Sequence, residues 1–259
     1  MSISVRWVGF DFGGTIQNPG KGYQSTAEAI REVYTEIGRP ELINDKLSRF
    51  DELVAESEYD EHFMDGIADD IDFWKRHYRF RNLREMGVQK IFNYIFDNNQ
   101  EAIKLFQNKG HRFWEPVNGL HECFEYLKDK EISINIVSEV GSEETIKSIA
   151  NFLRIHNLTH YSDIITNFGR IKKNGDMDLS YKGLGKNDGA IYKKLARDLI
   201  DIGIQPFQAL MIGDRPVEDV EKAKENGFKA IQFTGVQKRR VSSAADYVIS
   251  NLKELENIL

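Results

Sequence analysis

Short apolar runs alternate along the chain with segments whose apolar positions have helical spacing. The first run, residues 5–10, ends abruptly at Asp11, which is typical of a buried strand in a parallel sheet. Strands that alternate with helices predict a parallel sheet with right-handed crossovers. We expect further strands over 132–138, 163–166, 207–214, 229–235 and 245–250, a hairpin over 171–183, and helices over 121–130, 142–153, 186–199, 218–226 and 251–259.

One long region departs from this alternation. A loop after Thr15 and a helix that starts near Ser25 lead into it, and residues 41–110 then show helical periodicity without a convincing strand. A helical insertion therefore separates the first strand from all the others. We predict two domains, an α/β core of residues 1–16 and 113–259 and an all-helical domain of residues 17–112.

Composition and charge exclude several classes of function. The formal net charge of −6 over 259 residues supplies no basic field that would attract nucleic acid or an anionic membrane. No apolar run is long enough to span a bilayer, and the N-terminus lacks the pattern of a secretory signal. Cys123 is the only cysteine, which excludes internal disulfides. We expect its side chain to lie on a helix and to contribute to the packing of that helix. We therefore expect a cytoplasmic protein, monomeric or homodimeric, without nucleic-acid or membrane partners.

Reactive polar residues follow several of the predicted strands. Asp11 and Ser138 each end a strand, Lys186 begins a predicted helix, and Asp214 ends a strand five residues before Asp219. The carboxyl ends of the strands meet at one edge of a doubly wound sheet, so we expect these side chains to converge. Carboxylates around a divalent cation, with a lysine and a serine beside them, form a site suited to a phosphoryl group.

Two known families share the segment Asp-Phe-Gly-Gly-Thr at residues 11–15. It resembles the first motif of the haloacid dehalogenase superfamily, DxDx[TV], and it is similar, even more closely, to the D-x-G-G-T phosphate loop of the sugar-kinase and actin-like ATPase fold. That ATPase fold runs straight into a second hairpin strand, whereas here a turn-rich loop and the helical region follow. Gly183, Gly185 and Lys186 superficially resemble a P-loop, but Asn187 stands where Ser or Thr is required.

Over its whole length the chain resembles the haloacid dehalogenase superfamily. The four motifs would be residues 11–15, Ser138 in INIVSE, Lys186 in GKNDGAIY, and GDRPVED at 213–219. The resemblance implies a Rossmann-like, doubly wound parallel sheet with an inserted all-helical cap that closes over the site and selects the substrate. It also implies a Mg²⁺-dependent hydrolase, with a small phosphorylated metabolite as substrate.

The same resemblance assigns roles to individual residues. Asp11 is implied to be the nucleophile and a metal ligand, and Asp214 to bind Mg²⁺. Ser138 and Lys186 would hold the phosphoryl group, and Asp219 would orient Lys186 or support the metal. Lys182 competes with Lys186 for its role, and we prefer Lys186 because it begins the predicted helix. Further implied contacts are Thr15 and Glu139 to the phosphoryl group and the Gly13 carbonyl to the metal.

One departure from the family pattern limits the functional prediction. Phosphatases of this superfamily carry a second aspartate two residues after the nucleophile, which protonates the leaving group and then activates water. Gly13 occupies that position here, so the acid/base carboxylate is missing. General acid–base help contributes typically ~10²–10⁴-fold, so the nucleophile, metal and lysine could still give a working enzyme.

Three functions therefore remain open. The first is a Mg²⁺-dependent phosphatase that uses a cap residue or a substrate group as the acid. The second is a phosphonatase- or dehalogenase-like hydrolase of C–P or C–halogen bonds, because those branches also lack this aspartate and recruit a basic residue of the cap. The third is a non-catalytic, ligand-binding member of the family. The basic candidates in the helical region are Lys21, Lys46, Arg49 and Lys75, together with the basic and aromatic segment 73–82.

Overall fold

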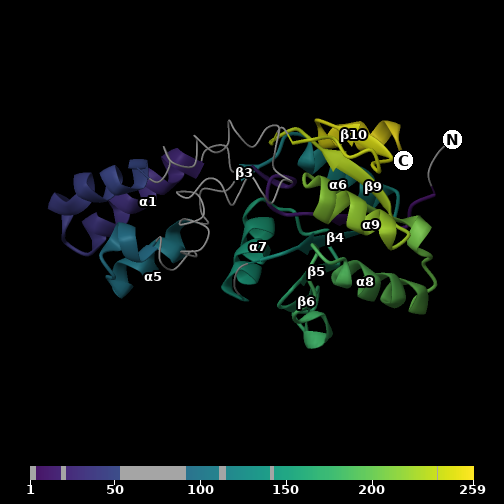
Figure 1. The fold of residues 1–259 in the computed structure, drawn as a ribbon, viewed down its shortest axis with the longest axis horizontal. Coiled ribbons are helices and arrows are strands. Elements are labelled where there is room, and N and C mark those ends of the chain that lie inside the picture. Colours follow the sequence, from purple (N-terminus) through teal and green to yellow (C-terminus); the bar gives the residue numbers. More distant parts are fainter. Residues whose placement is uncertain (1–3, 19–21, 53–91, 111–114, 141–142, 238) are drawn as a thin grey trace, which may run out of the picture. The chain divides into compact units, whose positions relative to one another are not determined.

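The computed structural model describes residues 4–18, 22–52, 92–110, 115–140, 143–237 and 239–259 (Figure 1). The chain divides into two compact units, one of Met1–Pro19 with Glu115–Leu259 and one of Gly20–Trp114. Within the described residues, no helix combines the length and apolar character that crossing a bilayer would need. The predicted segment 73–82 and the candidates Lys21 and Lys75 lie outside the described residues.

An eight-stranded sheet forms the centre of the first unit, in the order β10-β9-β8-β1-β4-β5-β6-β7. Strand β1 lies in its middle, parallel to β8 on one side and to β4 on the other. The chain leaves β1 toward β4 and β5 and later returns to β8 on the opposite side of β1. The end of β1 is therefore the switch point at which open α/β sheets bind their ligands. The parallel strands are β1 (Trp7–Phe10), β4 (Ser133–Ser138), β5 (Asp163–Thr166), β8 (Ala209–Gly213), β9 (Lys229–Phe233) and β10 (Tyr247–Ile249).

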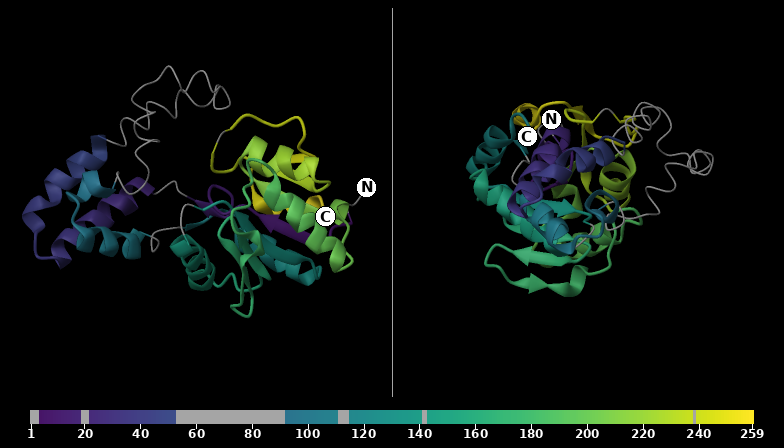
Figure 2. Two further views of the ribbon diagram at one scale, coloured as in Figure 1. Left: turned by 60° about the horizontal axis from the view of Figure 1, so that its bottom comes forward. Right: turned by 90° about the vertical axis from the view of Figure 1, so that its left-hand side faces the viewer.

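Helices cover both faces of this sheet (Figure 2). Successive side chains of a strand point to opposite faces, so Trp7 packs against Phe228 on one face while Phe10 contacts Phe124 of α6 on the other. Helix α8 contributes to the apolar cluster around Trp7. The sheet is therefore the middle layer of three, as in other doubly wound α/β folds. The helices are α6 (Leu120–Asp129), α7 (Glu143–Ile155), α8 (Ala190–Asp201) and α9 (Lys222–Glu225).

Two smaller elements complete the unit. Strands β6 (Gly169–Lys172) and β7 (Met177–Asp178) extend the sheet as an antiparallel hairpin, which confirms the turn predicted at Asn174 and Gly175. Strand β2 (Gln17–Asn18) pairs with β3 (Glu115–Pro116) in a separate two-stranded ribbon. Because β2 pairs with β3 and not with β1, the hairpin expected for the sugar-kinase and actin-like fold is not formed.

The second unit is helical over its described residues. Helix α1 (Gly22–Glu36) and helix α5 (Gln100–Gly110) pack through a shared apolar cluster that includes Tyr34 and Phe96. A short 3₁₀ turn (Pro40–Leu42) leads into a helix over 43–52, and another helical stretch spans 92–96. Lys46 is buried beside this cluster and pairs with Asp45, 2.7 Å away, and with Asp97.

The structure corrects two of the predicted helices. Helix α8 begins at Ala190 and not at Lys186, because Gly189 adopts a left-handed φ of +74° and ends the preceding loop. The C-terminal segment forms a 3₁₀ helix, Leu252–Asn257, capped by Asn251, in place of an α-helix. Cys123 is fully buried in α6, as expected.

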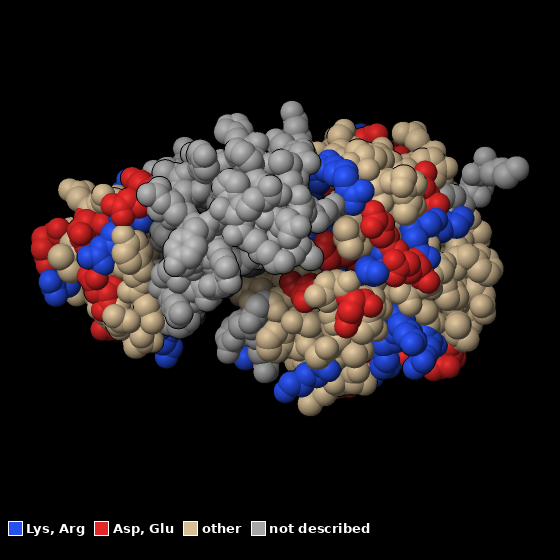
Figure 3. Space-filling model, in the orientation of Figure 1, with Lys and Arg blue, Asp and Glu red and all other residues tan. Residues whose placement is uncertain are grey.

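Charged side chains are interspersed on the face of the molecule drawn in Figure 3. Acidic and basic groups alternate over the described residues of that face. This mixture is typical of an ordinary solvated surface.

Candidate active site

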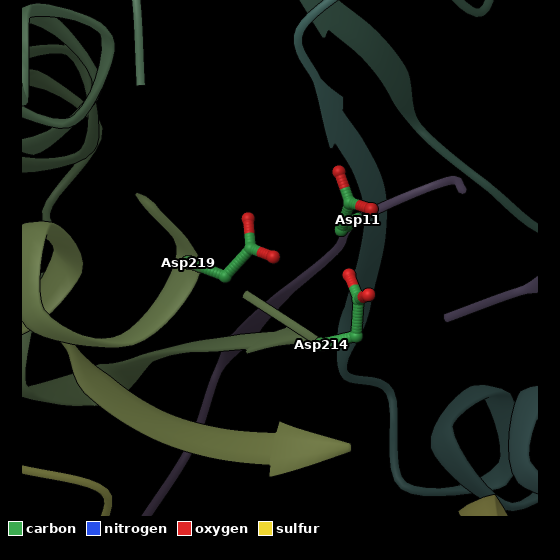
Figure 4. Close-up of side chains that lie close together, drawn as sticks. All are labelled: Asp11, Asp214 and Asp219. Carbon is green, nitrogen blue, oxygen red and sulfur yellow. The ribbon is translucent and has the colours of Figure 1, made fainter. Parts of the chain in front are cut away.

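Three aspartates converge at the carboxyl ends of the central strands (Figure 4). Asp11 follows β1 and Asp214 follows β8, and the two strands are joined by the hydrogen bond from the Asp11 amide to the Ile212 carbonyl, 2.8 Å. Asp219 reaches the same place from the helical turn Pro216–Glu221. One carboxylate oxygen of each aspartate lies within 4.8 Å of those of the other two, and all three residues are buried. The predicted convergence of Asp11 with Asp214 is therefore observed.

The loop after Asp11 folds tightly against Asp214. The amides of Ile16 and Gln17 donate to the Phe12 carbonyl at 3.1 and 3.0 Å, which closes the turn. Gly14 has φ of +77°, and a Cβ added there would lie 3.0 Å from Oδ2 of Asp214. Glycine is required here both for the left-handed backbone and for the close approach of this carboxylate.

Lys186 supplies the central positive charge. Its Nζ donates to Oδ1 of Asp11 and to Oδ1 of Asp219, each at 2.6 Å, and the residue is 2% exposed. The Lys186 amide donates in turn to Oε2 of Glu139, 3.0 Å away. Glu139, at the end of β4, thereby anchors the loop that carries the lysine.

Asp219 is held by a second hydrogen bond besides the one from Lys186. Its Oδ2 accepts from the backbone amide of Arg215 at 3.0 Å. Both carboxylate oxygens of Asp219 thus have partners within the protein, an arrangement suited to holding the lysine in place.

Two buried hydroxyl groups lie close to these residues in the sequence. Ser138 ends β4, the strand next to β1, and is 5% exposed. Thr15 is fully buried, and its Oγ1 finds no hydrogen-bond partner within the described part of the chain. Gly13 is exposed, and an added Cβ would meet no atom within 4 Å.

Burial and mutual repulsion govern the ionisation of these groups. Burial raises the pKa of Asp11 to about 7, with Asp219 and Asp214 adding to the rise and Lys186 opposing it. Burial alone would lower the pKa of Lys186, but the charges of Asp11 and Asp219 raise it above its ordinary value. Burial also raises the pKa of Asp214, against the opposing effect of Arg239. Lys186 therefore stays charged, while Asp11 is only partly ionised at neutral pH and would ionise fully beside a further cation.

The donor set fits a hard divalent cation. Oδ1 of Asp214 is buried and has no hydrogen-bond partner among the described residues. Buried carboxylate oxygens are the ligands that Mg²⁺ prefers, and a cation placed among three carboxylates would relieve their repulsion. Asp11 and Asp214, which follow neighbouring strands, are the residues that would hold it.

Lys46 and Arg49, the two basic candidates of the helical unit that the structure describes, are engaged in ion pairs. Besides its pairing with Lys46, Asp97 also pairs with Arg49, whose Nη1 donates to the Tyr94 carbonyl at 2.9 Å. Although burial lowers the pKa of Lys46, hydrogen bonds to Asp45 and Asp97 raise it overall. A lysine that forms a Schiff base needs a lowered pKa, so Lys46 is poorly suited to that role. In the first unit, Lys182 is exposed, whereas Lys186 lies among the aspartates.

Sequence reasoning missed two residues that contact Asp214. Arg239 Nε donates to Oδ2 of Asp214 at 2.8 Å. Gln232, at the end of β9, is fully buried, and its Nε2 lies 3.4 Å from the Asp214 carbonyl oxygen. Arg239 stands in a short basic run without periodicity, so only the fold reveals its proximity to a residue 25 positions earlier.

Comparison with known proteins agrees with this geometry. A model of the haloacid dehalogenase-like hydrolase family matches residues 5–227. No curated protein sequence matches the chain.

Solved structures share the fold at low sequence identity. A magnesium-bound structure of YfnB from Bacillus subtilis, described as a HAD-hydrolase, is 17% identical with a TM-score of 0.59 and covers 98% of each chain. A HAD phosphatase from Thermococcus onnurineus is 19% identical with a TM-score of 0.55, covering 98% of this chain and 97% of its own. A 2-haloacid dehalogenase from Pseudomonas syringae is 17% identical with a TM-score of 0.53, covering 98% and 97%. The family match over most of the sequence shows that this chain belongs to the haloacid dehalogenase-like hydrolases.

Proposed function

We propose that this hydrolase is a Mg²⁺-dependent phosphatase that acts on a small phosphorylated metabolite through an aspartyl-phosphate on Asp11. The observation that carries the proposal is the contact of Lys186 with Asp11 at 2.6 Å, beside the orphaned, buried oxygen of Asp214. A nucleophilic carboxylate, an adjacent fixed ammonium and a cation site are the parts that phosphoryl transfer needs.

In the proposed reaction, a carboxylate oxygen of Asp11 attacks phosphorus, and the ester P–O bond breaks. The leaving alkoxide takes a proton from solvent or from a group of the substrate or helical unit, because Gly13 offers none. Water then attacks phosphorus of the aspartyl-phosphate, which releases inorganic phosphate and restores the carboxylate. Bound Mg²⁺ would neutralise charge on the phosphoryl oxygens and on the ligating carboxylates.

Protein groups would hold the phosphoryl group during both steps. The ammonium of Lys186 is fixed by Asp219 and by the anchoring of its backbone to Glu139, so its charge is preorganised. Ser138 and Thr15 offer hydroxyl groups. Among the described residues, Oγ1 of Thr15 has no hydrogen-bond partner, so it can donate to a ligand. We assign Asp219 to orienting Lys186 and Asp214 to the metal.

The absence of the acid/base aspartate favours substrates with good leaving groups. General acid–base catalysis contributes ~10²–10⁴-fold. Enzymes accelerate phosphate monoester hydrolysis by up to ~10²¹-fold, so loss of this contribution leaves room for a substantial rate. Acyl phosphates and aryl phosphates expel stable anions and depend least on a protonated acid.

Gly13 also favours a second candidate, hydrolysis of a C–P or C–halogen bond, because the corresponding branches lack the same aspartate. The phosphonatase form of this candidate needs a lysine with a lowered pKa. Among the proposed residues that the structure describes, Lys46 is held as a charged partner of Asp45 and Asp97. This pairing argues against Lys46 as the lysine of a phosphonatase.

A substrate panel separates these functions. We expect Mg²⁺-dependent release of phosphate from acetyl phosphate or p-nitrophenyl phosphate, and none from Asp11→Asn. Trapping of a lysine adduct with phosphonoacetaldehyde and borohydride would instead establish the phosphonatase, and halide release from 2-haloacids the dehalogenase. A protein that binds Mg²⁺ but turns over none of these compounds would be a non-catalytic member of the family.

A further inference from the structure

The loop that follows β9 reaches back to Asp214. Gln232, the penultimate residue of β9, fixes this loop from a buried position: its Nε2 donates to the Arg240 carbonyl and its Oε1 accepts from the Ser242 amide, both at 2.7 Å. Ser242 Oγ also donates to Oε1 of Glu221, 2.8 Å away. The loop is therefore held at several points close to the residue it carries toward the site, Arg239.

Arg239 contacts Asp214 through one nitrogen and the loop through another. Its Nε donates to Oδ2 of Asp214 at 2.8 Å, and its Nη2 donates to Oε1 of Gln237. The side chain of Arg239 is 27% exposed, whereas that of Asp214 is 2% exposed. A half-buried guanidinium with two partners is fixed in direction and can in turn fix the carboxylate that it touches.

The two oxygens of Asp214 are consequently unlike. Oδ2 lies between Arg239 and Gly14, where even a Cβ on the glycine would come within 3.0 Å of it. Oδ1 is buried and accepts no hydrogen bond within the described residues. Rotation of the carboxylate would break the contact with Arg239, so the free oxygen is held in one direction.

We propose that Arg239 is a positioning residue of the metal site, holding Oδ2 of Asp214 so that Oδ1 is presented to the cation. This inference rests on the metal-dependent function proposed above. Partners that hydrogen-bond a metal ligand typically change metal affinity by ~10–100-fold when they are removed. The guanidinium of Arg239 also repels the cation, but this repulsion is weak because water screens its partly exposed charge. Loss of the contact has the larger effect, because it leaves Oδ2 of Asp214 buried and unpaired.

The test is Mn²⁺ binding to the full-length protein, measured by calorimetry without substrate. We expect Arg239→Gln to weaken binding by ~10-fold or more, because the glutamine amide is too short to reach Oδ2 from the same backbone. Arg239→Lys should recover part of the affinity, since an ammonium can replace the single contact from Nε. Arg240→Gln is the matched control: it removes the same charge from the same loop, where Arg240 faces Glu221 at 3.4 Å, and should bind Mn²⁺ as wild type does.

Several outcomes would overturn the inference. Unchanged or tighter Mn²⁺ binding by Arg239→Gln would do so, as would an equal loss in Arg240→Gln, which would trace the effect to loop charge. Should Arg239→Gln fail to fold, Gln237→Ala is the deciding variant. It removes the second partner of the guanidinium and should weaken Mn²⁺ binding by a smaller factor. Wild-type Mn²⁺ affinity in Gln237→Ala would then overturn the inference. Wild-type protein that binds no Mn²⁺ would overturn both proposals, whereas binding without phosphoester turnover would overturn the phosphatase alone.

Discussion

The ammonium group of Lys186 lies 2.6 Å from Oδ1 of Asp11, although 175 positions separate the two residues in the chain. The contact joins the loop before α8 to the end of β1, the central strand of the sheet. Because both residues are buried, each charge depends on the other for its stability. The pair therefore contributes to folding as well as to the proposed catalysis.

Replacement of Lys186 should therefore affect stability as well as activity. Lys186→Met leaves Asp11 and Asp219 without their shared cation, and breaking a buried ion pair from one side costs about 3–5 kcal/mol. We expect a lower melting temperature in EDTA, partial recovery with millimolar Mg²⁺, and loss of turnover. Lys182→Met is the control, because Lys182 is exposed. Equal effects of both substitutions would contradict the assignment of Lys186.

Asp11→Asn should abolish turnover while the fold is retained. The amide is close in size to the carboxylate but is not nucleophilic, and loss of a nucleophile lowers kcat by ~10⁴-fold or more. Phosphate release from acetyl phosphate measures the effect, and radiolabelled substrate followed by acid quench detects the covalent phosphate in wild type alone. Asp201→Asn, at an exposed carboxylate, serves as the control. Normal turnover by Asp11→Asn would refute the proposed mechanism.

Gly13→Asp should be accepted by the fold and should help catalysis. An added Cβ meets no atom within 4 Å at Gly13. We expect unchanged stability and faster hydrolysis of alkyl phosphates, by up to ~10²–10⁴-fold if the new carboxyl reaches the leaving group. Gly13→Asn, which has the same shape without the acid, should give no gain. A large loss of activity in Gly13→Asp alone would speak against the phosphatase.

Gly14→Ala, unlike Gly13→Asp, should lower both stability and metal affinity. The alanine Cβ would approach Oδ2 of Asp214 to 3.0 Å, at a backbone φ of +77° that strains any L-residue. Such strain costs about 1–3 kcal/mol, and a displaced Asp214 would bind Mn²⁺ less tightly. Thermal unfolding and calorimetric titration measure the two effects. Wild-type values for both would show that the close approach has no influence.

Metal binding should release protons near neutral pH. Because burial raises the pKa of Asp11 to about 7 in the metal-free protein, Asp11 is partly protonated at pH 6.5 and must lose that proton to become a ligand. The apparent Mn²⁺ affinity should accordingly rise with pH up to about 7 and then level off. Calorimetry in two buffers of different ionisation enthalpy counts the protons at pH 6.5 and pH 8.5. Equal proton release at both values would contradict this ionisation behaviour.

The same shift has a consequence for the stability of the metal-free protein. Between the ordinary pKa of 3.8 and about 7, folded Asp11 holds a proton that the unfolded chain has lost. The contribution of Asp11 to stability therefore falls as pH rises through this window. Bound Mg²⁺ should remove that fall, because the cation favours the ionised carboxylate.

The fold was largely predictable because its strands are strongly patterned. Residues 163–166 form β5 as expected, and the apolar runs that end at Asp11 and Asp214 are β1 and β8. Two-residue strands such as β2 carry no periodic signal, and the start of α8 depended on the left-handed Gly189, which a helix-spacing argument overlooks.

The site was predictable only in part, for a related physical reason. Asp11 and Asp214 stand at the ends of patterned strands, so the topology of the sheet brings them together. Arg239 and Gln232 act through contacts between a loop and a strand end, and no local spacing of residue types announces such a pairing. Glu139 was expected to contact the phosphoryl group, and its carboxylate accepts a hydrogen bond from the backbone amide of Lys186, a contact that no spacing of residue types announces.

The ribbon of β2 and β3 allows the helical insertion to vary in length and sequence. Gln17 and Asn18 pair directly with Pro116 and Glu115, so the chain returns beside the point from which it left. Residues 20–114 form a separate unit, so the sheet receives the chain back at nearly the place where it left. Loop-closure entropy grows only slowly with length, so this excursion can be lengthened, shortened or exchanged at little cost to the layer that holds the aspartates. The helical unit can thus change in the course of evolution while the residues that hold Lys186 and the three aspartates stay as they are.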